Sequence, residues 1–247
     1  MMTSFLCEGN AFIDAYTESD LLGKIIIITL IALSVVTWSV LVHKIWITKQ
    51  VKKNSFLFRK TFFESRSDPL AIPTSGIKNS EYPNAFGIIY DVLKNKTLEI
   101  FDKNRKNDQL LKKKEAPQHL TSADIALLET HATATSSTLT KFLEKNLYIL
   151  STIVTLAPFL GLLGTVYGIL TTFTELKSST GGSSNQIILG GLSLALSTTV
   201  LGLIDAIPAL IGYNYLKNVA YDFDSEMDRF STDVLSTLEL HYRKPGE

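Results

Sequence analysis

The sequence predicts an all-α integral membrane protein with three transmembrane helices. Of the 247 residues, 45% are hydrophobic and only 19% are charged. The charged residues leave three long uncharged runs, which cover residues 25–42, 146–174 and 178–204. A helix needs roughly 20 mostly apolar residues to cross the hydrocarbon core of a membrane, and these runs meet or approach that length.

The distribution of basic residues predicts the orientation of these helices. Residues 1–23 contain no lysine or arginine, whereas 18 of the 24 basic residues fall between residues 44 and 145. Cytoplasmic segments of membrane proteins are enriched in lysine and arginine. We therefore expect a short periplasmic N-terminus over residues 1–23, a first transmembrane helix over residues 24–46 and a cytoplasmic domain over residues 47–145.

The cytoplasmic domain is predicted to be helical. Thr121 and Ser122, followed by Asp124, are typical of a helix start. Few helix-breaking residues separate Asp124 from Leu147, so we expect this helix to run directly into the second transmembrane helix, residues 146–174. A periplasmic loop over residues 175–185 then leads to the third transmembrane helix, residues 186–216.

The second transmembrane segment carries small residues and one proline. Gly161, Gly164 and Gly168 recur at helical spacing, which lets two helix backbones approach closely in lipid. Pro158 is expected to kink or interrupt the helix near its cytoplasmic start. The hydroxyl group of Thr165 can bond its own helix, so that residue alone predicts little.

The third transmembrane segment combines hydroxyl groups with a carboxyl group. Thr198 and Thr199 precede Gly202, Asp205 and Pro208. A carboxylate at mid-bilayer costs roughly 2.5 kcal/mol or more, so it usually faces water or a partner. The alternative is that Asp205 lies just outside the cytoplasmic boundary, bonded to water or to Lys217.

The cytoplasmic tail, residues 217–247, has an amphipathic pattern. Apolar residues recur every three or four positions from Leu216 onwards, and aspartates fall between them. We expect a helix that continues the third transmembrane helix and packs on the long cytoplasmic segment or on a neighbouring subunit. Its apolar residues are Leu216, Val219, Phe223, Met227, Phe230, Val234 and Leu238.

No motif in the sequence indicates an enzyme or a bound cofactor. The chain has no Walker loop, no Rossmann glycine pattern, no paired-histidine metal spacing and no nucleophile elbow. Its formal net charge is zero, which gives no support for nucleic-acid binding. If the protein performs work, the energy must come from another source.

Two segments resemble the signatures of the MotA/TolQ/ExbB proton-channel family. The run from Pro158 to Ile169 resembles the family pattern Pro-x-x-Gly-Leu-x-Gly-Thr-Val-x-Gly-Ile. The run from Ala195 to Asn214 resembles the pattern Ala-Leu-x-x-Thr-x-x-Gly-Leu-x-x-Ala-Ile-Pro-Ala-x-x-x-Tyr-Asn. Three predicted transmembrane helices, rather than four, favour the TolQ/ExbB branch.

The resemblance implies a pentameric ring in the bacterial inner membrane. Its second and third transmembrane helices would line a channel that holds a dimer of a single-span, TolR/ExbD-like partner. Protons, as the driving ion and in place of a cofactor, would power work on the outer membrane, with a TonB- or TolA-like protein as a possible third component. Thr165 and Thr199 correspond to the channel-facing threonines of the family, and Thr198 and Asp205 complete the expected proton pathway.

One position departs from the family pattern. The family commonly has a glutamate five residues before the threonine that Thr199 matches, and this chain has Leu194 there. Asp205 follows eleven residues later, which at about 100° per residue returns to within about 20° of the same helix face. Asp205 is therefore a hypothetical partial replacement that lines an inner exit for protons. In the alternative, the carboxyl group of the partner suffices and Leu194 only packs.

Two other functions remain open from the sequence. The Leu194 departure is compatible with a non-conducting scaffold that anchors a single-span partner. An unrelated three-span solute transporter would need polar substrate-binding groups near the middle of the membrane, and the sequence shows no such set.

Overall fold

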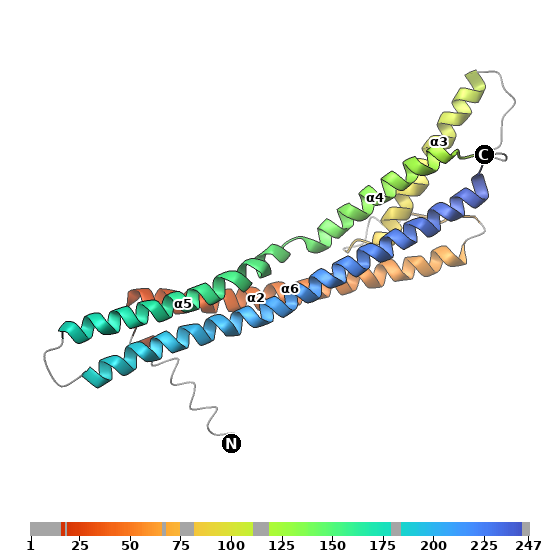
Figure 1. Cartoon of the computed structure of the whole chain (residues 1–247). Helices are drawn as coiled ribbons and strands as arrows, with labels where there is room; N and C mark the ends of the chain where they lie inside the picture. Colours follow the sequence, from red (N-terminus) through yellow and green to blue (C-terminus); the bar gives the residue numbers. More distant parts are fainter. Residues whose placement is uncertain are drawn as a thin grey trace. The chain divides into compact units, whose positions relative to one another are not determined.

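The described part of the chain folds mainly into α-helices. The computed structural model describes residues 16–17, 19–65, 68–74, 82–110, 119–178 and 184–243. Parts of the predicted segments 1–23 and 175–185 lie outside these ranges. Within them the helices are α2 (Leu21–Glu64), α3 (Ala85–Leu110), α4 (Ser122–Glu144), α5 (Leu147–Ser178) and α6 (Ser184–Tyr242) (Figure 1). Among the described residues α2, α5 and α6 are long and apolar enough to cross a membrane, which confirms the predicted helical structure and the three candidate spans.

The helices form two compact units. The first unit contains Met1–His43 and Asn146–Leu216, and the second contains Lys44–Lys145 and Lys217–Glu247. Helix α5 belongs to the first unit, whereas α3 and α4 belong to the second. Helices α2 and α6 each contribute one segment to the first unit and another to the second. Each unit is therefore built from parts of the chain that are far apart in sequence.

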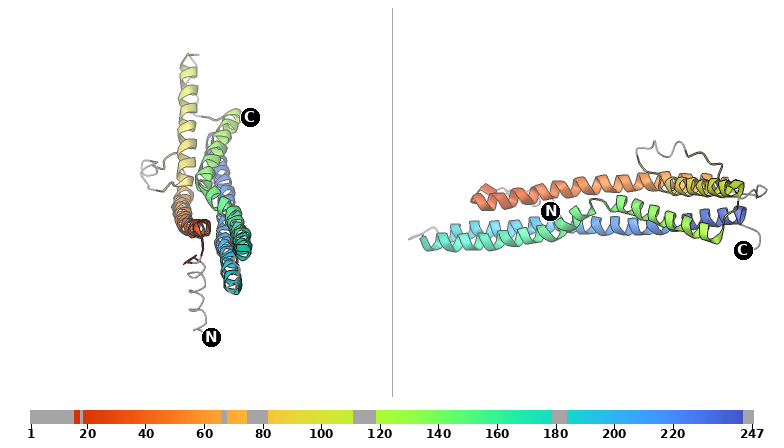
Figure 2. Two further views of the ribbon diagram at one scale, coloured as in Figure 1. Left: turned by 90° about the vertical axis from the view of Figure 1, so that its left-hand side faces the viewer. Right: turned by 90° about the horizontal axis from the view of Figure 1, so that it is seen from above.

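The first unit is a three-helix bundle in which α5 runs antiparallel to α6 (Figures 1 and 2). Gly168 of α5 lies against Gly191 of α6, and Ala157 of α5 lies against Gly202 of α6. Residue numbers therefore decrease along α5 in the direction in which they increase along α6, so the two helices are antiparallel. Helix α2 completes the bundle. Buried apolar side chains from all three helices form its core: Ile26, Leu30, Ile153, Ala157, Ala206 and Ala209.

The second unit is centred on a cluster of aromatic side chains. Phe86 of α3 stacks on Phe230 of α6, with ring centroids 4.7 Å apart and an interplanar angle of 14°. Phe62 of α2 meets the same Phe230 ring edge to face at 5.4 Å. All three side chains are 0% exposed. Large aromatic side chains bury the most apolar surface per residue, so this cluster is the main source of stability in the unit.

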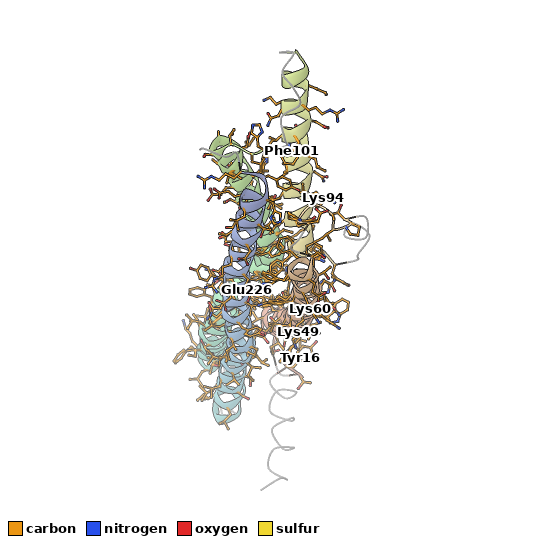
Figure 3. The ribbon with its side chains drawn as sticks, turned by 90° about the vertical axis from the view of Figure 1, so that its right-hand side faces the viewer. Tyr16, Lys49, Lys60, Lys94, Phe101 and Glu226 are labelled. Atoms are coloured by element: carbon orange, nitrogen blue, oxygen red, sulfur yellow. The ribbon has the colours of Figure 1, made fainter. Side chains whose placement is uncertain are left out.

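Hydrogen bonds stabilise the start of α3 and hold the segment between α2 and α3 against α3. The Asn84 side chain accepts a hydrogen bond from Gly87 N at 3.0 Å, which caps the start of α3. The buried hydroxyl of Tyr90 donates to Pro69 O at 2.8 Å, and Lys94, which projects from α3 in Figure 3, donates to Ile72 O at 2.9 Å. Burial raises the pKa of Tyr90 to about 12.

The predicted start of α4 is confirmed in detail. The Thr121 hydroxyl accepts a hydrogen bond from Asp124 N at 3.2 Å, and the Asp124 carboxylate accepts one from Thr121 N at 3.0 Å. These two bonds form a capping box, which satisfies two backbone donors that the helix start would otherwise leave unpaired.

The Thr121→Ala substitution is expected to destabilise the start of α4 by about 1 kcal/mol, because it removes the acceptor for the Asp124 amide. Faster hydrogen exchange at the first amides of α4, measured by mass spectrometry, would report this loss. The matched control is Thr130→Ala. Thr130 is on the same helix and its hydroxyl donates only to its own backbone, to Ala126 O. Equal exchange in both variants would contradict the capping role.

The prediction that this helix runs directly into the second transmembrane helix is wrong. Helix α4 ends at Glu144, and α5 begins at Leu147. Between them Asn146 has φ 68°, a left-handed conformation that asparagine tolerates better than most residues. Lys44 of α2 donates from Nζ to Leu143 O at 2.9 Å, so a cationic side chain caps the carbonyl end of α4.

The predicted continuation of the third transmembrane helix is confirmed. Helix α6 runs without a break from Ser184 to Tyr242. Its final part packs on the long segment of the second unit, where Thr140 of α4 donates to the Asp224 carboxylate at 2.5 Å. The buried residues of this part include Phe223, Met227, Phe230, Val234 and Leu238, as the amphipathic pattern predicted.

Candidate functional site

The contact between α5 and α6 is built from glycines. A Cβ atom added at Gly202 would lie 2.6 Å from Ala157 O, and one added at Gly168 would lie 2.9 Å from Gly191 O. A Cβ atom added at Gly161 would lie 3.0 Å from Thr198 O. These distances are too short for a side chain, and the atoms in the way belong to the opposite backbone. The predicted packing role of the small residues therefore has a direct geometric basis.

Thr198 lies inside this contact. Its side chain is 0% exposed, and its hydroxyl donates to backbone carbonyls of its own helix, 3.0 Å to Ala195 O and 3.1 Å to Leu194 O. Gly164 of α5 leaves the space that the Thr198 side chain fills. Within one subunit this hydroxyl is thus held between two helices and does not reach the open side of the bundle.

Thr199 lies at the edge of the same contact, and Thr165 follows Gly164 on α5; both side chains are half-buried. The Thr199 hydroxyl is 3.3 Å from Ala195 O and 3.4 Å from Gly161 O of the facing helix. The Thr165 hydroxyl donates to Leu162 O at 2.7 Å. A threonine hydroxyl that donates to the backbone keeps its lone pairs as acceptors for water or a hydrated proton.

Large apolar side chains are exposed on both α5 and α6. Only 28% of the most apolar stretch of α5 is buried within the chain. The most apolar stretch of α2 is buried to the same extent, 28%. The exposed residues include Leu162, Val166, Ile169, Leu196, Val200 and Leu203.

Asp205 lies on a different side of α6, toward α2. It is 4% exposed, and the Ser34 side chain of α2 lies close enough to act as a hydrogen-bond donor to its carboxyl group. Leu194 also faces α2, because a Cβ atom added at Gly23 would lie 3.1 Å from Leu194 Cδ2. Asp205 and the position of the missing glutamate therefore share one face of α6.

The two prolines do not interrupt their helices. Pro158 lies inside α5 and Pro208 lies inside α6, and both helices continue past them. Each proline removes one backbone donor, so the carbonyl group four residues earlier loses its helical partner. Helix α5 was predicted to kink or be interrupted at Pro158, and the structure shows no interruption there.

Two polar partners were missed by reasoning from the sequence. Ser34 lies in the run of residues 34–38, which resembles the first span of TolQ, but that resemblance does not connect it with Asp205; the register of α2 against α6 does. The second is Asp20, whose carboxylate accepts a hydrogen bond from the Tyr167 hydroxyl at 2.5 Å and so joins the start of α2 to α5. Among the described residues, no group of three or more histidine, cysteine or acidic side chains could hold a metal ion.

The sequence of the site agrees with a family of membrane proteins. A model of the MotA/TolQ/ExbB proton channel family matches residues 102–229, which is just over half of the 247 residues. The match covers α4, α5 and all of α6 that forms the first unit. The chain belongs to this family. Family members are transport and motor membrane proteins rather than enzymes.

Several characterised relatives place the chain in the ExbB and TolQ branch. A "Biopolymer transport protein ExbB" of Aquifex aeolicus (strain VF5) is 51% identical over 78 residues, which are 32% of this chain and 52% of that protein. The ExbB of Helicobacter pylori (strain J99 / ATCC 700824) is 54% identical over 74 residues, 30% and 50% of the two chains. Each alignment thus spans about half the length of the ExbB protein that it matches.

A third relative matches over nearly its full length. The "Tol-Pal system protein TolQ" of Haemophilus influenzae (strain ATCC 51907 / DSM 11121 / KW20 / Rd) is 24% identical over 232 residues, 90% of this chain and 92% of that protein. The identity to this relative is lower than to the two ExbB proteins, but the alignment covers most of both chains.

Proposed function

We propose that this protein is an inner-membrane motor subunit of the TolQ/ExbB type, which conducts protons together with a TolR/ExbD-like partner. The flow of protons would be converted into mechanical work on the outer membrane or its transporters. Membership of the proton-channel family carries this proposal. The half-buried pair Thr165 and Thr199, at the edge of the glycine contact, supports it, because their hydroxyl groups can accept hydrogen bonds from water.

The proposed topology has three spans, over residues 24–46, 146–174 and 186–216, with a periplasmic N-terminus and a cytoplasmic C-terminus. The excess of basic residues in the second unit supports this orientation. The antiparallel arrangement of α5 against α6 fits a chain that crosses the membrane alternately in both directions.

The proposed assembly is a pentameric ring around a dimer of the single-span partner, with a TonB- or TolA-like protein as a further component. The large exposed apolar surface of α5 supports contact with other protein chains in addition to lipid. Five copies of a 27.4 kDa chain give about 137 kDa, so native mass spectrometry of the purified complex tests the ring directly.

The Thr199→Val substitution is expected to reduce proton uptake strongly in proteoliposomes that contain this protein and a single-span, aspartate-bearing partner. Valine keeps the shape of threonine but offers no hydroxyl group to water. The matched control is Thr29→Val on α2, where the hydroxyl also donates to its own backbone, to Ile25 O at 2.7 Å. Uptake equal to that of the unchanged complex in both variants would remove Thr199 from the pathway.

A non-conducting scaffold is the second candidate, and Leu194 favours it. The family glutamate is replaced there by an apolar side chain that is 5% exposed and packs toward α2. A complex that assembles with its partner and carries no protons across the membrane would support the scaffold and overturn the motor function.

A further inference from the structure

Helices α2 and α6 make a regular contact that surrounds Asp205. In the first unit the two helices meet at three levels: Gly23 with Leu194, Ser34 with Asp205, and Leu41 with Gly212. The spacing between levels is the same along both helices, so they run parallel in constant register. Asp205 is therefore a fixed member of this contact, with packed residues on both sides of it along the helix axis.

Asp205 is buried in the contact between α2 and α6, next in sequence to the apolar core residue Ala206. The core of the first unit, with Ile26 and Leu30 of α2 and Ala206 and Ala209 of α6, adjoins it. The ion pairs formed among the described residues do not include Asp205. Counted along the helices, the other described titratable side chains of the first unit lie more than one helical turn from its level: Tyr16, Asp20, Lys24, His43, Tyr148, Tyr167, Glu175, Lys177, Tyr213 and Tyr215.

This environment favours a neutral carboxyl group. An ionised carboxylate has about four acceptor positions, and the donor side chain close to this one among the described residues is Ser34 of α2. Burying a charge without a cation or a full set of hydrogen bonds costs several kcal/mol. A protonated carboxyl group avoids most of that cost, and it can also donate a hydrogen bond.

We propose that Asp205 and Ser34 form a proton-binding site in the α2–α6 contact, separate from the threonine pair at the α5–α6 edge. While the contact is closed, the carboxyl group holds its proton and is bonded to the Ser34 hydroxyl. When α2 and α6 separate and water enters, the O–H bond breaks, the proton passes to water and a carboxylate remains. Uptake of a proton from water reverses the step and favours closure.

This inference rests on the proposed motor function for its physiological role, but its chemistry can be tested alone. Binding of a proton at Asp205 makes the packing of α2 against α6 depend on protonation. The site would thus connect proton occupancy to a helix contact. Ser34 acts as a positioning residue, because it orients the carboxyl group and does not itself exchange the proton.

Infrared difference spectroscopy of the full chain in lipid nanodiscs at pH 7 tests the proposal. The unchanged protein is expected to show a carbonyl-stretch band of a protonated carboxyl group, which Asp205→Asn loses. Ser34→Ala is expected to keep the band at a shifted frequency, because the hydrogen bond from Ser34 is gone. Asp222→Asn, which alters an exposed carboxylate on the same helix, is the matched control and should leave the band unchanged.

The possible failures are distinguishable. If the unchanged protein and Asp205→Asn give the same spectrum, Asp205 is ionised and the inference is overturned, whether or not the complex carries protons. An unshifted band in Ser34→Ala would overturn the assigned pair. If the band behaves as expected but the complex with its partner transports no protons, the proposed motor function fails while the proton-binding site stands. Native mass spectrometry of each variant confirms that assembly is intact.

Discussion

Replacement of Phe230 by alanine is expected to destabilise the second unit by about 3–5 kcal/mol. Phe230 is fully buried, and its ring contacts Phe86, Phe62 and Phe58 from two other helices. Alanine would remove these contacts and leave a cavity, because three rigid aromatic rings can close only part of the space. The α6 segment of the unit would lose its main apolar contact to α2 and α3.

Hydrogen exchange followed by mass spectrometry measures this loss peptide by peptide, without assuming that the whole membrane protein unfolds in one step. Amides of α3 that are protected in the unchanged protein should exchange from about a hundredfold to several thousandfold faster in Phe230→Ala, since about 1.4 kcal/mol corresponds to a factor of ten. Leu240→Ala on the same helix is the control, because Leu240 is 86% exposed. Similar rates in the two variants would show that the aromatic cluster does not stabilise the unit.

Replacement of Gly202 by alanine is expected to destabilise the first unit by about 1–3 kcal/mol. The added methyl group would lie 2.6 Å from Ala157 O and 3.3 Å from Gly161 Cα. Both atoms belong to the backbone of α5, so neither can rotate away. The two helices must move apart. This movement weakens the contact between α5 and α6 along its whole length and displaces Thr199 from Gly161.

Gly212→Ala is the matched control for this prediction. A Cβ atom added at Gly212 also meets a neighbour, but the neighbour is the Leu41 side chain of α2, which can change its rotamer. Thermal unfolding of the purified assembly should therefore show a larger decrease in Tm for Gly202→Ala, by about 2–4 °C per kcal/mol for a chain of this size. A larger decrease in Tm for Gly212→Ala than for Gly202→Ala would contradict the role assigned to the contact between α5 and α6.

Much of the fold could be predicted from the sequence, because its signals are local or periodic. The uncharged runs predict the apolar helices, and Thr121 with Asp124 marks the start of α4. The three-to-four-residue spacing from Phe223 to Leu238 predicts the buried face at the end of α6. The break at Asn146 could not be predicted in this way. It depends on the left-handed conformation of Asn146 and on Lys44, a residue far away in the sequence.

The candidate site was only partly predictable for a similar reason. Glycines at helical spacing indicate a close helix contact, but the sequence does not say which helix they meet. Thr198 and Thr199 are adjacent in sequence, yet Thr198 is buried in the contact between α5 and α6, whereas Thr199 lies at its edge. Asp205 could be recognised as unusual, whereas its partner Ser34 became evident only from the register of α2 against α6.

The second unit has a consequence for the order in which the protein is made. Its core is assembled from residues 44–145 and from the last part of the chain, beginning at Lys217. During translation, Phe62, Phe86 and Tyr90 leave the ribosome well before Phe223, Met227 and Phe230, which cover them. The nascent chain must therefore keep an aromatic surface exposed until its final residues are synthesised, which makes this stage the one most open to aggregation and to proteases.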